Sequence, residues 1–325
     1  MRKPKTKPKF IPKPEQMALW PDISGNTVNG LDETEVRQPT PIYWQKPELT
    51  PFGPIMQYYK SVQPPDKKLM EIRQREYDFA AQEISPKSNI RKENTPEEWT
   101  KLVKDVGLKN NGDVVGITRM RPEWVISSFE VPYETVIMSG VSMDFDQLKE
   151  APGIISAREV SRQYGRAQQV SKAIASWIHE QGWNAVSYGG SNHVPMLLIP
   201  PAVECGFGEL GKHGSLINDK YGSAFRLGAV VTDMPLDLDA KKVFGADEFC
   251  MNCKACEAAC PPDAISSSKK MVRGVDKWYV DFDKCLPYFT ESIGCGICLA
   301  VCPWSRPGVA DNLIRKLAKK RQKNT

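Results

Sequence analysis

Eight of the nine cysteines in this 325-residue chain fall into two runs near its C-terminal end. The first run is Cys250-Met-Asn-Cys253-Lys-Ala-Cys256-Glu-Ala-Ala-Cys260-Pro261. The second consists of Cys285 followed by Cys295-Gly-Ile-Cys298-Leu-Ala-Val-Cys302-Pro303. Three thiolates at three-residue spacing can ligate three iron corners of one [4Fe–4S] cubane. The last cysteine of each run, which precedes a proline, then extends toward a second cubane.

This crossed arrangement is typical of bacterial ferredoxins, in which the last cysteine of each run ligates the cluster of the other run. Because Cys285 lies ten residues before Cys295, the spacing predicts a loop that brings Cys285 back to its site. We therefore expect two [4Fe–4S] clusters with four thiolate ligands each. The first site comprises Cys250, Cys253, Cys256 and Cys302, and the second comprises Cys285, Cys295, Cys298 and Cys260.

Zinc sites and disulfides are the alternative uses of so many cysteines. Zinc favours two separated cysteine pairs and often recruits histidine, but no histidine follows His213. Disulfides require an exported chain, and the basic N-terminal residues lack the apolar segment of an export signal. The sequence therefore indicates reduced thiolates and predicts a cytoplasmic location. Cys205, outside both runs, is expected to be a buried small apolar residue.

The net charge of +5 is concentrated at the two ends of the chain. Solvated or disordered ends are the simplest interpretation, because neither end carries the interleaved aromatics of a nucleic-acid groove. Contact with nucleic acid or anionic lipid is an alternative. A further alternative is docking of an acidic electron donor such as a ferredoxin or flavodoxin, since charge steering accelerates encounter. No apolar run is long enough to span a membrane.

The pattern along the chain predicts an N-terminal arm followed by an α/β region. Residues 1–65 are rich in proline and scattered aromatics and are expected to wrap the body of the protein. Helices are predicted at 66–84, from the Thr95 capping box onward, at 156–181 and at 195–205. Strands are predicted at 113–118, 135–143, 185–188 and 226–233. The predicted domains are an arm with helices (1–110), a catalytic domain (111–244), a two-cluster domain (245–308) and a basic tail (309–325).

Residues 136–240 resemble the corrinoid-dependent reductive dehalogenases and, more distantly, the epoxyqueuosine reductases. Among the matching segments, Cys205-Gly-Phe-Gly-Glu-Leu-Gly-Lys-His-Gly-Ser-Leu-Ile217 stands ahead of the two cysteine runs. With those runs included, the resemblance covers roughly residues 110–305. It implies an α+β fold, in which a nitroreductase-like α/β domain that binds a cobamide (cobalamin) precedes a ferredoxin-like two-cluster domain.

The resemblance also implies a base-off cobamide that needs no histidine ligand below the cobalt. We expect the three histidines to occupy exposed helix or loop positions. The glycine-dense turn between strand and helix elements allows a backbone to approach a large ligand closely. The predicted cobamide-binding residues are Gly206, Gly208, Glu209, Leu210, Gly211, Lys212, His213 and Gly214, beside the strand that begins near Arg226.

Three residues are predicted to carry the reaction. Similarity to the dehalogenases places Tyr164 over the cobalt face as the proton donor, with Arg226 and Asn192 assisting it. A phenol needs a nearby cation to act as an acid near neutral pH. The family provides a first basic residue where this chain has Ala224, so Ala224→Arg is expected to raise activity if the pocket is otherwise unchanged. The alternative to a catalytic role is helix packing for Tyr164 and capping of a loop for Asn192.

The sequence thus predicts a cobamide- and iron–sulfur-dependent oxidoreductase that removes halide from an organohalide-like small molecule. One alternative is epoxide reduction of the epoxyqueuosine-reductase kind, although Gln168 and Gln169 stand near the place where that family has an aspartate. A third possibility is a corrinoid-binding or electron-transfer protein without catalysis. Nucleic acid is not an expected partner.

Overall fold

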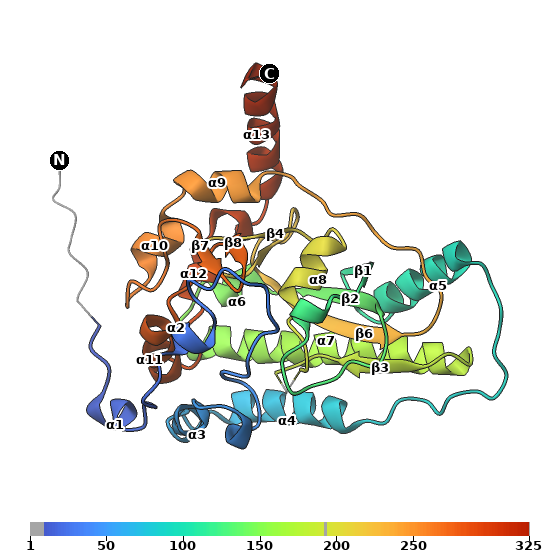
Figure 1. Ribbon diagram of the computed structural model, residues 1–325, viewed down its shortest axis with the longest axis horizontal. Helices are drawn as coiled ribbons and strands as arrows, with labels where there is room; N and C mark the ends of the chain where they lie inside the picture. Colours follow the sequence, from blue (N-terminus) through green and yellow to red (C-terminus); the bar gives the residue numbers. More distant parts are fainter. Residues whose placement is uncertain (1–9, 192–193, 325) are drawn as a thin grey trace.

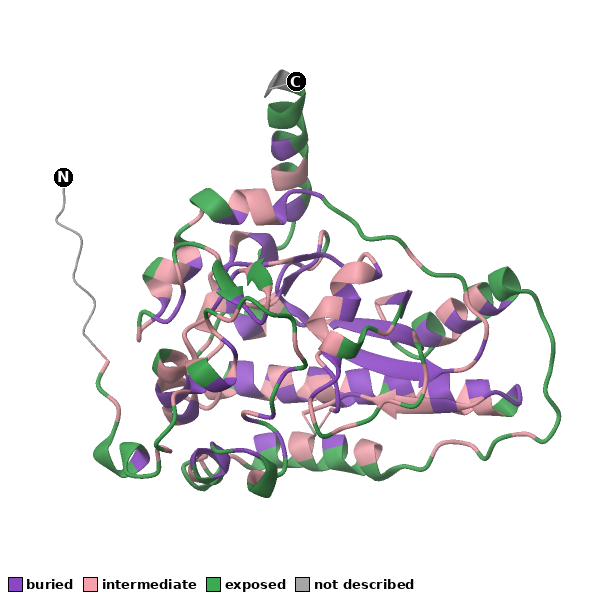
Figure 2. Cartoon of the chain, viewed as in Figure 1, coloured by how far each residue is buried: buried purple, intermediate pink, exposed green. Residues whose placement is uncertain are grey.

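The computed structural model describes residues 10–191 and 194–324. Its centre is a four-stranded sheet with the order β1-β2-β6-β3, in which every neighbouring pair is antiparallel. The strands are rich in β-branched residues and largely buried, which places the sheet in the core (Figure 2). They are β1 (Val114–Arg119), β2 (Thr135–Ser142), β3 (Ala185–Tyr188) and β6 (Phe225–Thr232).

Helices cover both faces of this sheet (Figure 1). The long helix α7 (Ile154–Glu180) packs along β2, β3 and β6, and α4 (Lys67–Ala81) packs on α7. Helix α5 (Pro96–Lys109) begins at a capping box formed by Thr95 and Glu98 and also contacts α7 and β1. Helix α8 (Ile199–Glu204) contacts β1 and β2 together with the short hairpin β4 (Glu209–Leu210) and β5 (Leu216–Ile217).

The C-terminal part contains two similar helical halves and a small hairpin. The first half has α9 (Ala246–Asn252) and α10 (Ala255–Ala259), and the second has α11 (Phe282–Glu291) and α12 (Ile297–Ala300). Helices α10 and α12 contact each other, as expected for two related cysteine runs. The remaining elements of this part are β7 (Lys270–Val272), β8 (Val275–Lys277), the 3-10 turn Pro303–Ser305 and α13 (Ala310–Asn324), which projects from the body beside α9 (Figure 1).

The N-terminal arm wraps around this C-terminal part. Asn26 bonds to Asp281, Asp283, Tyr279 and the Phe282 N–H. Further along, the arm's aromatics join an apolar cluster with Leu286 and Phe289. The elements of the arm are α1 (Pro14–Met17), α2 (Gly25–Val28), the 3-10 turn Pro47–Leu49 and α3 (Gly53–Ser61). Two further short elements lie outside the arm: the 3-10 turn Pro122–Trp124 follows β1, and α6 (Phe145–Leu148) follows β2. The described part of the arm, from residue 10 onward, therefore lies against the C-terminal part of the chain.

The predicted α+β fold with a ferredoxin-like two-cluster domain is confirmed, although one predicted helix is shorter than expected. The helix predicted at 195–205 is confined to α8, since Pro200 and Pro201 fall in its first turn. Cys285 lies on helix α11, and between it and Cys298 the chain turns back through Ile293, Gly294, Cys295 and Gly296, all at positive φ. Within the described residues, no helix combines the length and apolarity needed to cross a bilayer.

Candidate functional site

The four cysteines predicted for the first site line one small cavity. Cys250 lies in the last turn of α9, and Cys256 lies on α10. Cys253 lies in the short segment that joins these two helices. Cys302 arrives from the far run just before the turn that carries Trp304. The empty volume of the cavity is about 260 Å³, and its remaining lining includes Lys212, His213, Phe249 and Trp304. The crossed ligand set is thus brought together around one space.

The four cysteines predicted for the second site line a much larger cavity. Cys260, Cys285, Cys295 and Cys298 all face this space, whose empty volume in the same measure is about 2810 Å³. The thiol of Cys298 is close enough to Cys256 of the first site for the two to interact electrostatically. The two sites are therefore neighbours, and only the second opens onto the large cavity.

The geometry favours cubanes over single zinc ions. In residues 10–191 and 194–324, no three cysteine, histidine or carboxylate side chains converge closely enough to hold one metal ion. A cubane spreads its ligands over separate iron corners, so thiolates around a shared cavity fit it. All nine cysteines are free thiols, which also leaves the disulfide alternative without support.

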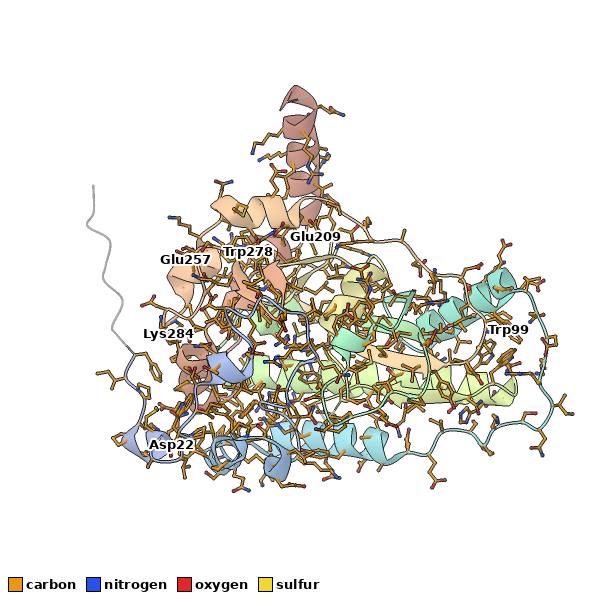
Figure 3. The ribbon with its side chains drawn as sticks, viewed as in Figure 1. Asp22, Trp99, Glu209, Glu257, Trp278 and Lys284 are labelled. Atoms are coloured by element: carbon orange, nitrogen blue, oxygen red, sulfur yellow. The ribbon has the colours of Figure 1, made fainter. Side chains whose placement is uncertain are left out.

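Some residues of the glycine-rich segment 206–214 pack against neighbouring elements, and others line the two cavities. The Glu209 carboxylate accepts hydrogen bonds from the N–H groups of Phe244, Gly245 and Ala246 and so caps the start of α9. Figure 3 labels Glu209 near α9. Lys212 lines the first cysteine cavity, whereas His213 lines both cavities. The cobamide-binding role predicted for these residues stays a prediction, and of the eight only His213 lines the large cavity.

The glycines of this segment make close protein contacts. A Cβ added at Gly208 would overlap the carbonyl oxygen of Ile217. At Gly206, with φ +83°, it would lie 2.6 Å from the carbonyl oxygen of Ala240. At Gly211 it would lie 2.6 Å from the His213 ring. These glycines are needed for packing of the hairpin, so a substitution such as Gly208→Val would act sterically on the hairpin itself and would not test ligand binding.

The expectation that the histidines are exposed is wrong for two of them. His213 is buried and bonds at both ring nitrogens, to the Ser215 N–H and to the Ser223 hydroxyl 2.8 Å away. Burial lowers the pKa of His213 to about 4, so the ring is neutral near pH 7. His179 is partly buried between the carbonyl oxygens of Ser85 and Ala185. His193 and the predicted Asn192 lie outside the described residues.

Tyr164 and Arg226 meet in the large cavity. Tyr164 lies on α7 and Arg226 at the start of β6, and both side chains line the cavity. The guanidinium carbon lies 5.1 Å from the centre of the tyrosine ring, within range of a cation–π contact. Arg226 Nε is buried and has no hydrogen-bond partner among the described residues. The two predicted residues therefore face a common space that retains an unsatisfied donor.

The arm and α4 supply cavity residues that sequence reasoning did not find. Tyr43 and Gln45 line the cavity, and the Tyr43 hydroxyl and Gln45 Oε1 are buried without a partner in the described residues. Glu76 of α4 also lines it and accepts a 2.6 Å hydrogen bond from the Ser191 N–H. Burial raises the pKa of Glu76. No local motif marks these residues, since the arm reaches the cavity only through tertiary packing.

Ala224 does not face the cavity. It is 3% exposed and packs with Met143, Leu148, Leu299 and Ala300 between α6 and α12. An arginine at this position would have to enter an apolar cluster, so the expected gain of activity from Ala224→Arg lacks a structural basis. Cys205 is buried in an apolar cluster beside β1, as predicted.

Comparison with known proteins fits both parts of this structure. A family model described as a 4Fe-4S dicluster domain matches residues 249–305. A tetrachloroethene reductive dehalogenase of Desulfitobacterium hafniense is 30% identical over 71% of this chain and 43% of its own length. An epoxyqueuosine reductase of Salmonella typhimurium is 30% identical over 45% of this chain and 41% of its own length.

Among solved structures, the catabolic reductive dehalogenase NpRdhA in complex with 3-bromo-4-hydroxybenzoic acid superposes with a TM-score of 0.68 at 25% identity. The match covers 77% of this chain and 38% of that protein. Fold and sites together define an iron–sulfur protein with a two-cluster domain packed against an α+β domain. The chain is a homologue of the reductive dehalogenases, with the epoxyqueuosine reductases as more distant relatives. It spans about half the length of the curated dehalogenases that it matches, between 43% and 52%.

Proposed function

We propose that this protein is a cobamide- and iron–sulfur-dependent oxidoreductase that removes halide from a small organohalide. The observation that carries the proposal is the large cavity, which brings Tyr164 and Arg226 together with the four cysteines of the second site. Such a reaction consumes two electrons and one proton and yields a C–H bond and a halide ion. When bound, the clusters supply single electrons and the cobamide supplies the reductive cleavage of the carbon–halogen bond.

The residues present fit a large cofactor with a polar rim. The part of the cavity accessible to water measures about 900 Å³, near the upper end of the ~300–1,000 Å³ typical of small-molecule sites. Its buried unpartnered atoms, Tyr43 Oη, Gln45 Oε1 and Arg226 Nε, offer bonds to a ligand bearing amides. His213 already uses both ring nitrogens, which supports a base-off mode without a ligand from this residue.

Tyr164 is the residue that would deliver the proton. Its hydroxyl is the acidic group of a side chain that faces the cavity from α7, next to the Arg226 guanidinium. A nearby cation favours the phenolate that remains after proton transfer. Arg226 thereby supplies the cation beside Tyr164 that the family provides at the position of Ala224, which is buried elsewhere in this protein. Asn192 remains the proposed third member of this group.

The proposed partners follow from the same arrangement. The substrate is a small organohalide, and the electrons come from an acidic carrier such as a ferredoxin or flavodoxin. Exposed cations on α13, among them Lys316 and Lys319, stand beside α9 of the first site and support a basic docking face. Free thiols throughout the chain support the proposed cytoplasmic location.

Anaerobic reconstitution with iron, sulfide and cobalamin tests the proposal. We expect roughly eight irons per chain, one bound corrinoid, a base-off cobalt EPR signal and halide release from tetrachloroethene or 3-bromo-4-hydroxybenzoate. Full iron content without corrinoid would instead identify an electron carrier. Bound corrinoid with reduction of an epoxyqueuosine-containing tRNA, and with no halide release, would place the chain with its more distant relatives.

A further inference from the structure

Lys212 is a buried cation at the first cysteine site. Its side chain is 2% exposed and lines the cavity of Cys250, Cys253, Cys256 and Cys302. The ammonium lies 3.5 Å from the Glu257 carboxylate and 5.1 Å from the centre of the Trp278 ring. Figure 3 labels both of these neighbours around α10 and the β7–β8 hairpin. Because Glu257 is 28% exposed, solvent weakens its compensation of the buried charge.

A chain of hydrogen bonds also reaches this site from the large cavity. The Ser215 N–H donates to His213 Nδ1 over 3.1 Å, so the proton of the neutral ring is on Nε2. Nε2 then donates to the Ser223 hydroxyl oxygen 2.8 Å away, which leaves the hydroxyl proton free. That hydroxyl forms a side-chain hydrogen bond with the sulfur of Cys302, which lines the first cavity. Ser223 is itself 1% exposed and fixed by the Ser305 hydroxyl.

The Lys212 ammonium and the Ser223 hydroxyl would both favour the reduced form of a cluster at the first site. Reduction of a [4Fe–4S] cluster adds one electron and hence one negative charge to the site. A buried cation and a hydroxyl donor to a ligand sulfur stabilise the more negative state, which raises the reduction potential. Among the described residues that line the second site's cavity, Lys60 and Arg73 are not buried. The third cation of that lining, Arg226, has a buried Nε but lies over the Tyr164 ring, so the described lining of the second site has no buried lysine equivalent to Lys212.

We propose that Lys212 and the His213–Ser223 pair are positioning residues that raise the reduction potential of the first cluster relative to the second. The first cluster then accepts the electron from the external donor most readily, and the second, beside the large cavity, passes it on as the stronger reductant. This inference rests on the proposed ligand sets but needs neither cobamide nor an organohalide.

EPR-monitored redox titration of the full chain, reconstituted with iron and sulfide alone, tests this assignment. The first cluster is identified as the one whose signal changes in Cys302→Ser. We expect Lys212→Met to shift its midpoint to a more negative potential, with a smaller shift in the same direction for Ser223→Ala. Ser223→Thr, which keeps the hydroxyl, should restore the wild-type value.

Lys269→Met is the matched control. Lys269 also lies over the Trp278 ring, at 5.7 Å, but pairs with Asp247 and does not line the first cavity. Its loss should leave both midpoints unchanged. If Lys212→Met fails to retain iron, Lys212→Gln and Ser223→Ala take its place. Unshifted first-cluster midpoints in the variants that retain iron, or equal shifts of both clusters, would overturn the proposal. Because no corrinoid is present, that result is distinct from a failure of the dehalogenase function.

Discussion

The two cysteine sites are related in sequence but differ in their surroundings. The first lines a small cavity, with buried Trp304 and Lys212 around it, and the second lines a much larger cavity that also contains Tyr164 and Arg226. The first cavity is small and the second is large enough to hold a further group beside its four cysteines. Similar motifs therefore take different tasks through the segments packed against them.

Gly222→Val should disrupt the first site most strongly. Gly222 has φ +57°, and a Cβ there would overlap the backbone of Trp304, two residues after Cys302. No small shift relieves an overlap with backbone, so we expect loss of the first cluster, measured by iron content and EPR. Gly308→Ala is the control, because nothing lies within 4 Å of its Cβ position and the cost is about 1 kcal/mol for its positive φ. Retention of full iron by Gly222→Val would contradict this packing.

Cys302→Ala tests the crossing of the two ligand sets. Cys302 lines the first cavity with the thiols of the other run. We expect iron to fall from roughly eight to roughly four per chain, with the remaining signal that of the second cluster. Cys205→Ala, which removes a buried thiol outside both sites, should retain full iron. Loss of the second cluster in Cys302→Ala would show that each run binds its own cluster.

Ala224→Arg should destabilise the protein. The side chain would enter the cluster formed by Met143, Leu148 and Leu299, and overpacking of this kind costs about 2 to 3 kcal/mol. The free energy of unfolding from denaturant titration measures the effect. Ala318→Arg on the exposed part of α13 adds the same charge without burial and should be nearly neutral. A stable Ala224→Arg with raised turnover would restore the role first predicted for this position.

Glu76→Gln should have the smallest effect and a defined pH dependence. Burial raises the folded-state pKa of Glu76 above the 4.5 of an unfolded carboxyl, so the native state holds its proton longer. Stability from this group is therefore fully present below about pH 4.5 and is lost as pH rises through the raised pKa. We expect the melting temperature of Glu76→Gln to exceed that of the wild type increasingly above pH 4.5. A constant difference between pH 4 and 8 would contradict the raised pKa.

Local patterns predicted the parts of this protein that depend on neighbours in sequence. Each of these predictions rested on a pattern of a few consecutive residues: the Thr95 capping box, strand 185–188 and the cysteine spacing. Burial of His213 and Ala224 depends on segments 10 to 80 residues away, such as Ser223 and Leu299. The same limit explains why Tyr43 and Gln45 were missed, since only tertiary packing carries the arm to the cavity.

Halide release by Tyr164→Phe tests the central claim most directly. A positioned acid contributes roughly two to four decades in rate, so turnover should fall at least ~100-fold while both clusters and corrinoid remain bound. Tyr77→Phe makes the same change elsewhere on the cavity lining and should retain activity near that of the wild type. The account predicts a large loss for Tyr164→Phe alone. Near-normal halide release from Tyr164→Phe with intact cofactors would contradict it.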